Sequence, residues 1–346
     1  MSADSARRDL ARLPKAHLHL HFTGSMRHST LLDLAGRHRL HLPDALLRDP
    51  REHPPHLDAA RERGWFRFQR LYDAARAVLV TEDDVRRLLH EVAADEQSEG
   101  SGWLEIQIDP SGYAARFGGL TPALELALDA AREAAVATGL GIGVVVAANR
   151  TKHPLDARTL ARLAARYSDA GVVGFGLSND ERRGRTGDFT AAFRIARSAG
   201  LSAVPHAGEL LGPESIRTAL ESLGATRIGH GVRSVEDPAV LELVAACDVA
   251  LEVSPWSNVS LGVYDSPTEV PLRRLVDAGV RVALAADDPL ISGRRLNDQY
   301  SFARDHLGFT DVELAHLARS SIAASHAPEA LRRRLRTGVD DWLASG

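Results

Sequence analysis

Eight short apolar runs of β type, separated by longer helical segments, constrain the fold of this sequence more than any other feature. The segments between the runs are rich in Ala, Leu, Glu and Arg, and several end in Gly, a common residue just past a helix. Such alternation is typical of a parallel sheet with crossover helices, and eight units favour a closed (β/α)8 TIM barrel over an open doubly wound sheet. The runs lie at residues 16–22, 103–109, 141–148, 172–177, 203–206, 227–230, 249–253 and 280–286.

The connection between the first two runs is too long for a single crossover. It spans about residues 24–102 and contains three helical patterns, at 28–40, 64–79 and 81–100. We predict a single α/β domain over residues 1–346, with this insertion at the C-terminal face of the barrel, where a lid would sit. Four aromatic residues of the second pattern are interpreted as packing for this layer, with an apolar gate over the site as the alternative: Trp65, Phe66, Phe68 and Tyr72.

Composition narrows the class of protein. The 42 basic and 46 acidic residues are well mixed and give a formal charge of −4, which argues against nucleic-acid and membrane-surface partners. The polar start MSADSARRDLARLPK lacks the apolar stretch of a signal peptide, and no run is long enough to span a bilayer. The single cysteine, Cys247, is expected to be a buried small hydrophobe. These features predict a cytoplasmic protein without internal disulfides.

Three histidines alternate in the first predicted strand: His17, His19 and His21. Because successive side chains of a strand point to opposite faces, all three point to the same face. A single histidine in a barrel is usually a satisfied core residue, whereas two imidazoles one pleat apart can bind one metal ion. This strand alone leaves both interpretations open.

Further candidate ligands stand at the ends of other predicted strands. His206 ends the fifth run in VPHAGE, His230 ends the sixth in RIGHGV, and Asp287 and Asp288 close the eighth in LAADDP. A barrel gathers these ends around one mouth. Three imidazoles and one carboxylate suit zinc, which can activate water near neutral pH. One histidine and one aspartate then remain for catalysis, and Glu209 is interpreted as a proton-transfer group rather than only a helix cap.

The segments LPKAHLHLHFTGS, HAGE, RIGHG and DDP resemble the adenosine deaminase family in their order and spacing. The resemblance covers about residues 13–343 and is more specific for the family than for one substrate. It implies a barrel hydrolase with one Zn²⁺ per chain that removes the 6-amino group of a small-molecule purine.

Individual roles follow from the resemblance by matching position. Glu209 matches the acid that protonates purine N1, His230 the histidine that orients the attacking water, and Asp288 the carboxylate that bonds N7. The implied zinc ligands are His19, His21, His206 and Asp287. The implied substrate-binding residues are His21, Thr23, Asn179 and Asp288.

Four positions depart from the family pattern. His17 replaces a common Glu and is expected to pack or to support the ligands, and Gln107 stands where Arg is frequent. Thr23 replaces an acidic residue that, as Asp in adenosine deaminases, holds the ribose 5′-hydroxyl. Asn179 stands where a Gly presents its backbone to purine N3. Thr23 and Asn179 weaken the case for unmodified adenosine as the substrate.

The leading predicted function is zinc-dependent deamination of adenosine or 2′-deoxyadenosine to the corresponding inosine. The alternative is the same chemistry on a 5′-modified adenine nucleoside such as aminodeoxyfutalosine, on AMP or on free adenine. Arg182, Arg183 and Arg185 are interpreted as solvated surface, or as a rim site for an anionic group. A catalytically silent relative is disfavoured by the retained site residues, and an unrelated zinc amidohydrolase by HAGE and RIGHG. No oligomeric state is predicted.

Overall fold

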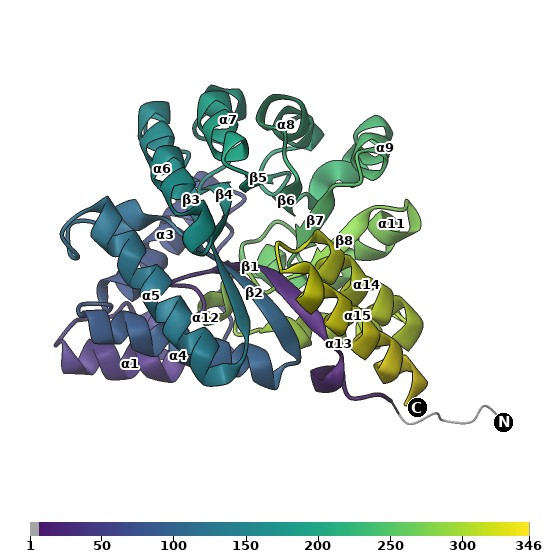
Figure 1. The fold of residues 1–346 in the computed structure, drawn as a ribbon, viewed down its shortest axis with the longest axis horizontal. Coiled ribbons are helices and arrows are strands. Elements are labelled where there is room, and N and C mark those ends of the chain that lie inside the picture. The colour runs from purple at the N-terminus through teal and green to yellow at the C-terminus, as the bar shows by residue number, and fades with distance from the viewer. Residues whose placement is uncertain (1–6, 346) are drawn as a thin grey trace.

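Eight parallel β-strands form the centre of the protein in a computed structural model, which describes residues 7–345 (Figure 1). Residues 1–6, which belong to the polar start considered above, and residue 346 lie outside the described part. The strands follow one another around the sheet in chain order, and each lies within about two residues of a predicted run. The (β/α)8 TIM barrel is therefore confirmed. The strands are β1 (Lys15–His21), β2 (Ser101–Ile108), β3 (Gly141–Asn149), β4 (Val172–Ser178), β5 (Ser202–Ala207), β6 (Arg227–His230), β7 (Ala250–Val253) and β8 (Arg281–Leu284).

The barrel closes between β1 and the segment that follows β8. Leu20 and Asp287 form a single parallel bridge. The His21 N–H donates to the Asp287 carbonyl at 3.0 Å, and the Asp287 N–H donates to the His19 carbonyl at 3.1 Å. The end of the last strand is thereby held beside the histidines of the first.

Helices surround the barrel and cover the outer faces of its strands (Figure 1). In α5, buried Ala and Leu side chains form one face, and the helix ends at Gly139, whose φ of 78° glycine adopts without a Cβ clash. The helices after β2 are α5 (Leu120–Thr138), α6 (Pro154–Arg166), α7 (Thr190–Ser198), α8 (Pro213–Thr218), α9 (Pro238–Ala246), α10 (Pro255–Ser260), α11 (Leu272–Asp277), α12 (Pro289–Ser292), α13 (Leu296–Leu307), α14 (Asp311–Ala324) and α15 (Glu329–Ala344).

The long connection between β1 and β2 contains the three expected helices, here α1 (His28–Arg37), α3 (Glu62–Ala77) and α4 (Glu82–Ser98). It also contains a one-turn helix, α2 (Asp44–Leu47), which is too short to produce a periodic apolar pattern. Helix α4 begins with a capping box in which Thr81 and Asp84 exchange side-chain and backbone hydrogen bonds.

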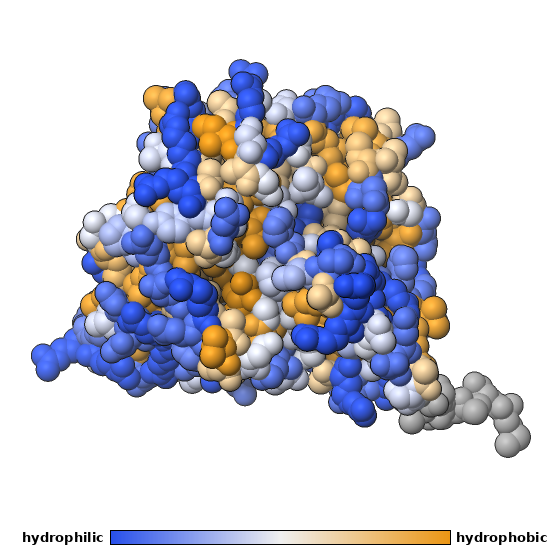
Figure 2. Space-filling view, viewed as in Figure 1, coloured by the Kyte–Doolittle hydropathy of each residue, from blue (hydrophilic) through white to orange (hydrophobic). Residues whose placement is uncertain are grey.

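Apolar side chains lie mainly between the barrel and its helices. Phe175 of β4 and Phe193 of α7, for example, pack edge to face with ring centroids 5.2 Å apart. The face shown in Figure 2 is mostly hydrophilic, with apolar groups scattered among polar ones. Cys247 was wrongly expected to be buried: it is exposed, because it follows the last turn of α9 at a surface bend.

No helix in residues 7–345 combines the length and the apolar character that crossing a bilayer requires.

Candidate active site

The four residues predicted to bind a metal meet at the C-terminal mouth of the barrel. His19 and His21 lie on β1, His206 lies on β5, and Asp287 follows β8. Asp287 Oδ1 lies 3.2 Å from His19 Nε2 and 3.1 Å from His21 Nε2. His21 Nε2 lies 3.2 Å from His206 Nε2. Possible ligand atoms of His19, His206, His230 and Asp287 lie within 4.8 Å of one another, and those of His21, Asp287 and Asp288 form a second group of this kind, so the two groups share Asp287.

This convergence fits a zinc ion better than a network of hydrogen bonds. Ligand atoms about 2.0–2.1 Å from a tetrahedral zinc lie about 3.3–3.4 Å from one another, close to the separations found here. His19 Nε2 is buried and has no properly directed hydrogen-bond partner in the described residues. Burial lowers the pKa of His19, but the carboxylates of Asp287 and Glu252 outweigh burial and raise it to about 10. The carboxylates thus favour positive charge at the centre of the cluster.

Buried polar side chains on the side away from the cluster fix the orientation of His19 and Asp287. His19 Nδ1 lies 2.9 Å from Glu252 Oε2, and Ser257 Oγ donates to Asp287 Oδ2 at 2.5 Å. Glu252 in turn accepts from Arg227 Nε at 2.7 Å, and Arg227 also pairs with Glu105. Such partners fix the ring orientation and tautomer of a metal-binding histidine. Glu105, Arg227 and Glu252 were not among the predicted site residues, although charged residues inside apolar strands are a signal for buried polar networks.

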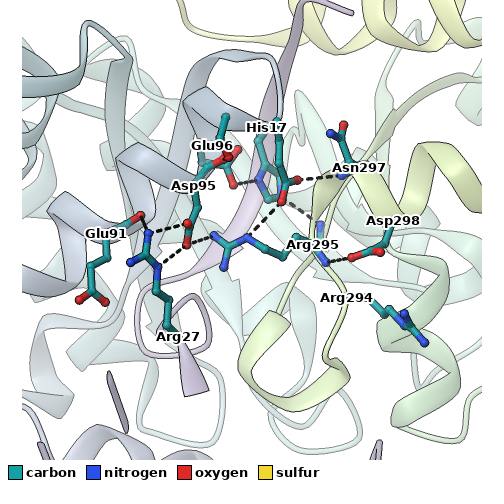
Figure 3. A network of polar contacts seen from close by, with 12 residues as sticks. His17, Arg27, Glu91, Asp95, Glu96, Arg294, Arg295, Asn297 and Asp298 are labelled. Carbon is teal, nitrogen blue, oxygen red and sulfur yellow. Dashed lines mark hydrogen bonds and ion pairs between the residues drawn. The ribbon is translucent and has the colours of Figure 1, made fainter. Parts of the chain in front are cut away.

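His17 lies beneath the cluster rather than in it. Its Nε2 accepts from the Ala286 N–H at 2.9 Å, and its Nδ1 lies 2.9 Å from Glu96 Oε1. Both ring nitrogens are therefore occupied, as a supporting residue requires. Glu96 belongs to a polar network that joins α4 to β1 and to the start of α13, in which Arg27 and Arg295 both pair with Asp95 (Figure 3).

Three further titratable groups surround the same point: Glu209, His230 and Asp288. All three are buried, and His230 Nε2 lies 3.5 Å from Glu209 Oε1. Burial, with the nearby charges of Asp287 and Glu181, raises the pKa of Glu209 well above its ordinary value. Burial and the neighbouring Asp287 raise the pKa of Asp288 to about 7. Burial is also the main cause that lowers the pKa of His230 to about 3. The cluster therefore combines a carboxylic acid with a neutral imidazole, a pairing suited to proton transfer.

Three site residues have left-handed backbone conformations that non-glycine residues rarely adopt. The φ angles are 80° at Asn179, 65° at His230 and 61° at Asp287. Each conformation costs about 1–3 kcal/mol, and such residues concentrate at functional sites because the surrounding structure holds them there.

A cavity of about 740 Å³, counting its open mouth, lies over the cluster. His21, His206, Glu209, His230, Asp287 and Asp288 line its base. Trp65, Phe68 and Tyr72 of α3 line its wall, which supports the gate interpretation for these three residues, whereas Phe66 is exposed. Gln107 also lines the cavity, and neither atom of its buried amide has a hydrogen-bond partner in the described residues. Gln107 was noted from the sequence as a departure from the family pattern and was assigned no role.

The two predicted sugar-side residues have different environments. Asn179 lines the cavity, and its side chain donates to Gln69 Oε1 at 3.0 Å. Thr23 is fully buried and does not line the cavity, and its Oγ1 lies 2.5 Å from the Tyr113 hydroxyl. Tyr113, rather than Thr23, therefore faces the space above the cluster.

Two of the three clustered arginines already have partners. Arg182 Nε donates to Asp180 Oδ1 at 2.8 Å and its Nη1 donates to the Ala60 carbonyl at 2.6 Å, while Arg183 pairs with Glu62. These contacts anchor the loop after β4 to the start of α3, and they favour the surface interpretation over a rim site for anions.

A parallel barrel with a His/Asp cluster and free acid–base groups at the C-terminal strand ends defines a metal-dependent hydrolase. The family model for adenosine deaminase matches residues 14–342. A putative adenosine/adenine deaminase of Streptomyces coelicolor is 60% identical over 98% of this chain and 99% of its own length. The chain belongs to the adenosine deaminase family.

Two other similar proteins are named for one activity. An adenine deaminase of Agrobacterium fabrum is 35% identical over 79% of this chain and 84% of its own. The crystal structure of an adenine deaminase from Arthrobacter aurescens has a TM-score of 0.86 and 30% identity, and the match covers 96% of this chain and 99% of that one. The protein is accordingly a hydrolytic deaminase that acts on an adenine compound.

Replacement of one candidate ligand tests the metal centre. His206→Ala leaves three candidate ligands, so we expect the purified variant to lose bound divalent metal together with ammonia release. Metal content by mass spectrometry and turnover are measured beside His316→Ala, which alters an exposed histidine of α14. Full metal content in His206→Ala would contradict the site.

Glu209 also predicts a specific pH dependence of stability. Its pKa is higher in the folded protein than its ordinary value of 4.5. Above that ordinary value the folded state retains a proton that the unfolded state releases, so the free energy of unfolding falls as the pH rises. Glutamine does not titrate and lacks this pH dependence. The Tm of Glu209→Gln minus the Tm of the unsubstituted protein should therefore increase between about pH 5 and about pH 8.

The matched control for this measurement is Glu214→Gln, which removes an exposed carboxylate from α8. A Tm difference for Glu209→Gln that does not change with pH would show that the carboxyl is not held protonated.

Proposed function

We propose that this protein catalyses the hydrolytic deamination of adenine, replacing the 6-amino group by oxygen and releasing ammonia. The observation that carries the proposal is the arrangement of Glu209, His230 and Asp288 around the ligand cluster, where burial raises the pKa of the Glu209 carboxyl. Adenosine and 2′-deoxyadenosine are the second candidates.

His19, His21, His206 and Asp287 would hold one zinc ion per chain. Three imidazole nitrogens and one carboxylate are typical zinc ligands and leave a position open for water or substrate. A bound zinc ion supplies Lewis-acid chemistry and lowers the pKa of a coordinated water.

Glu209 supplies the proton that the ring requires. When water oxygen bonds to C6, the C6–N1 double bond becomes a single bond and its electron pair collects on N1. The Glu209 carboxyl donates its proton to N1 as this charge develops, which removes the energetic cost of an anionic ring. Glu209 Oε1 has no hydrogen-bond partner among the described residues and is therefore available for this contact.

His230 and Asp288 complete the proton transfers. His230 is a neutral imidazole that can accept a proton from the attacking water, and its Nδ1 lies 3.3 Å from the Asn258 amide, which orients the ring. Asp288 Oδ1 is also buried without a partner in the described residues, and we assign it to purine N7. The protonated His230 then passes its proton to the exocyclic amino group, and the bond between C6 and that amino nitrogen breaks to release ammonia. The remaining hydroxyl proton returns to the Glu209 carboxylate as the C6=O bond forms, which leaves a 6-oxopurine and restores both residues.

The free base is favoured over the nucleoside by the contact between Thr23 and Tyr113. The Thr23 hydroxyl, at the position associated with the ribose 5′-hydroxyl, is occupied by the Tyr113 hydroxyl at 2.5 Å. The Tyr113 ring packs against Phe22 with centroids 5.5 Å apart, so this side of the cavity is filled by protein. The adenine deaminases among the similar proteins support the same interpretation.

One observation favours a nucleoside. The cavity continues past Asp109 and Asn149 into a second hollow on the rim, which could accommodate a sugar that extends outward from the purine ring.

The cytoplasmic location and the absence of nucleic-acid and membrane partners remain predictions from composition. The lid role of the 24–102 insertion remains a prediction from its position.

The acid role predicts a large defect in one conservative variant. Glu209→Gln retains the size of the side chain but has no proton to donate to N1, so kcat should fall at least ~10²-fold with bound metal unchanged. Ammonia release from adenine and metal content are measured on the same preparation. A kcat near that of the unsubstituted enzyme would assign the acid role to another group.

The substrate is tested by comparing kcat/KM for adenine and adenosine. We expect the unsubstituted enzyme to prefer adenine, and Tyr113→Ala to shift the ratio toward adenosine by about tenfold because it vacates space beside Thr23. Tyr113→Phe, which retains the ring, should leave the ratio nearly unchanged. If the unsubstituted enzyme uses adenosine as well as adenine, the free-base proposal is wrong.

A further inference from the structure

The loop after β5 carries both His206 and Glu209, and it is held by a carboxylate from a different loop. Glu181 follows β4, and its side chain is 2% exposed. Its Oε1 accepts from the Gly208 N–H at 2.7 Å, and its Oε2 accepts from the Glu209, Leu210 and Leu211 N–H groups at 3.0, 2.7 and 2.9 Å. One carboxylate thus binds four successive backbone N–H groups.

A fifth donor completes the arrangement. The Ser215 hydroxyl, in α8, donates to Glu181 Oε1. A carboxylate offers about four lone-pair sites, so these donors use its full accepting capacity. The four N–H groups can point at one acceptor because the loop is sharply curved at Gly208, which has a φ of 71°. An amide in place of the carboxylate would direct its own N–H groups at some of these donors.

The Glu209 carboxyl, in contrast, has little to position it. Its Oε1 is buried without a hydrogen-bond partner in the described residues, and His230 Nε2 lies 3.5 Å from it. A strong hydrogen bond to the carboxyl oxygen that must reach the ring nitrogen would compete with the substrate. Its position must therefore come from its backbone, and Glu181 holds that backbone.

The start of the same loop is fixed separately. The fully buried Arg150 donates from Nη2 to the His206 carbonyl at 2.5 Å, and from Nη1 to Thr186 Oγ1 at 3.3 Å. The segment from His206 to Glu209 is thereby held at both ends. The Arg150 guanidinium binds the carbonyl of its first residue, and the Glu181 carboxylate binds the N–H groups of its last two.

We propose that Glu181 is a positioning residue for the reaction, which places the Glu209 carboxyl against the substrate by binding the four N–H groups of the Gly208–Leu211 turn. This inference rests on the proposed acid role of Glu209. It assigns no direct substrate contact to Glu181.

The test is a double-mutant cycle on kcat for ammonia release from adenine, using zinc-loaded enzyme. Glu181→Gln should lower kcat by about tenfold to a hundredfold with metal content unchanged, since small displacements of a catalytic group have effects of this size. In a Glu209→Gln background the same substitution should lower kcat less than about twofold, because the group that Glu181 positions no longer acts. Glu181→Asp, which retains the charge, should recover part of the loss.

A purely structural role gives a different result. If Glu181→Gln lowers kcat by the same factor in both backgrounds, the effect does not pass through Glu209 and the inference is overturned. An unaffected kcat in Glu181→Gln overturns it as well. If Glu209→Gln itself remains active, the proposed acid role fails instead, and the two failures are thereby distinguished.

Two further variants keep the test decisive. Ser215→Ala removes one donor to Glu181 without removing charge, and should lower kcat severalfold even if Glu181→Gln does not fold. Asp84→Asn is the matched control, because Asp84 is also a buried carboxylate that accepts backbone N–H groups, from Val80 at 3.0 Å and Thr81 at 2.7 Å. It should lower Tm and leave kcat unchanged. If Ser215→Ala and Asp84→Asn have equal effects on kcat, the positioning role is excluded.

Discussion

The ion pairs beneath His19 are the interaction on which the rest of the site depends. Arg227 of β6 lies between Glu252 of β7 and Glu105 of β2, and Glu252 holds the ring of His19. Burying such a set is expensive, and an apolar replacement of equal volume is often as stable or more stable. What apolar residues cannot do is fix the tautomer and direction of an imidazole at the centre of a barrel. The protein retains a costly core because the geometry of the cluster requires it.

Other residues at the C-terminal mouth of the barrel also adopt positions that lower the stability of the fold and are required by the geometry of the site. His230 and Asp287 have left-handed backbone conformations, and the Glu209 carboxyl is buried where its ionised form is disfavoured, which raises its pKa. The hydrogen bonds of the eight-stranded barrel and the packing of the apolar layer outside it offset the free energy that these features cost. The barrel therefore acts as a rigid frame for groups that would not adopt these positions in isolation.

Sequence reasoning recovered the barrel because apolar runs and Gly-terminated helices reflect local physics. It also identified the residues that converge here, since His206 and Asp287 stand at strand ends, which a barrel brings together. It did not find Glu181 or Tyr113, whose roles depend on contacts between loops distant in the chain, for which one sequence carries no periodic signal. Helix α2 was missed for lack of length, and Cys247 was misplaced because an apolar neighbourhood in sequence does not define burial at a helix end.

The closure of the barrel also affects how the chain is made. The histidines of β1 leave a ribosome long before Asp287, which bridges to Leu20. Contacts between residues so distant in the chain form slowly, and during synthesis one edge of β1 has no strand beside it. A nascent chain of this protein therefore has an unpaired edge on β1 until the segment around Asp287 has been made. Chaperones that cover such edges should matter more to its yield than to that of a helical bundle of equal length.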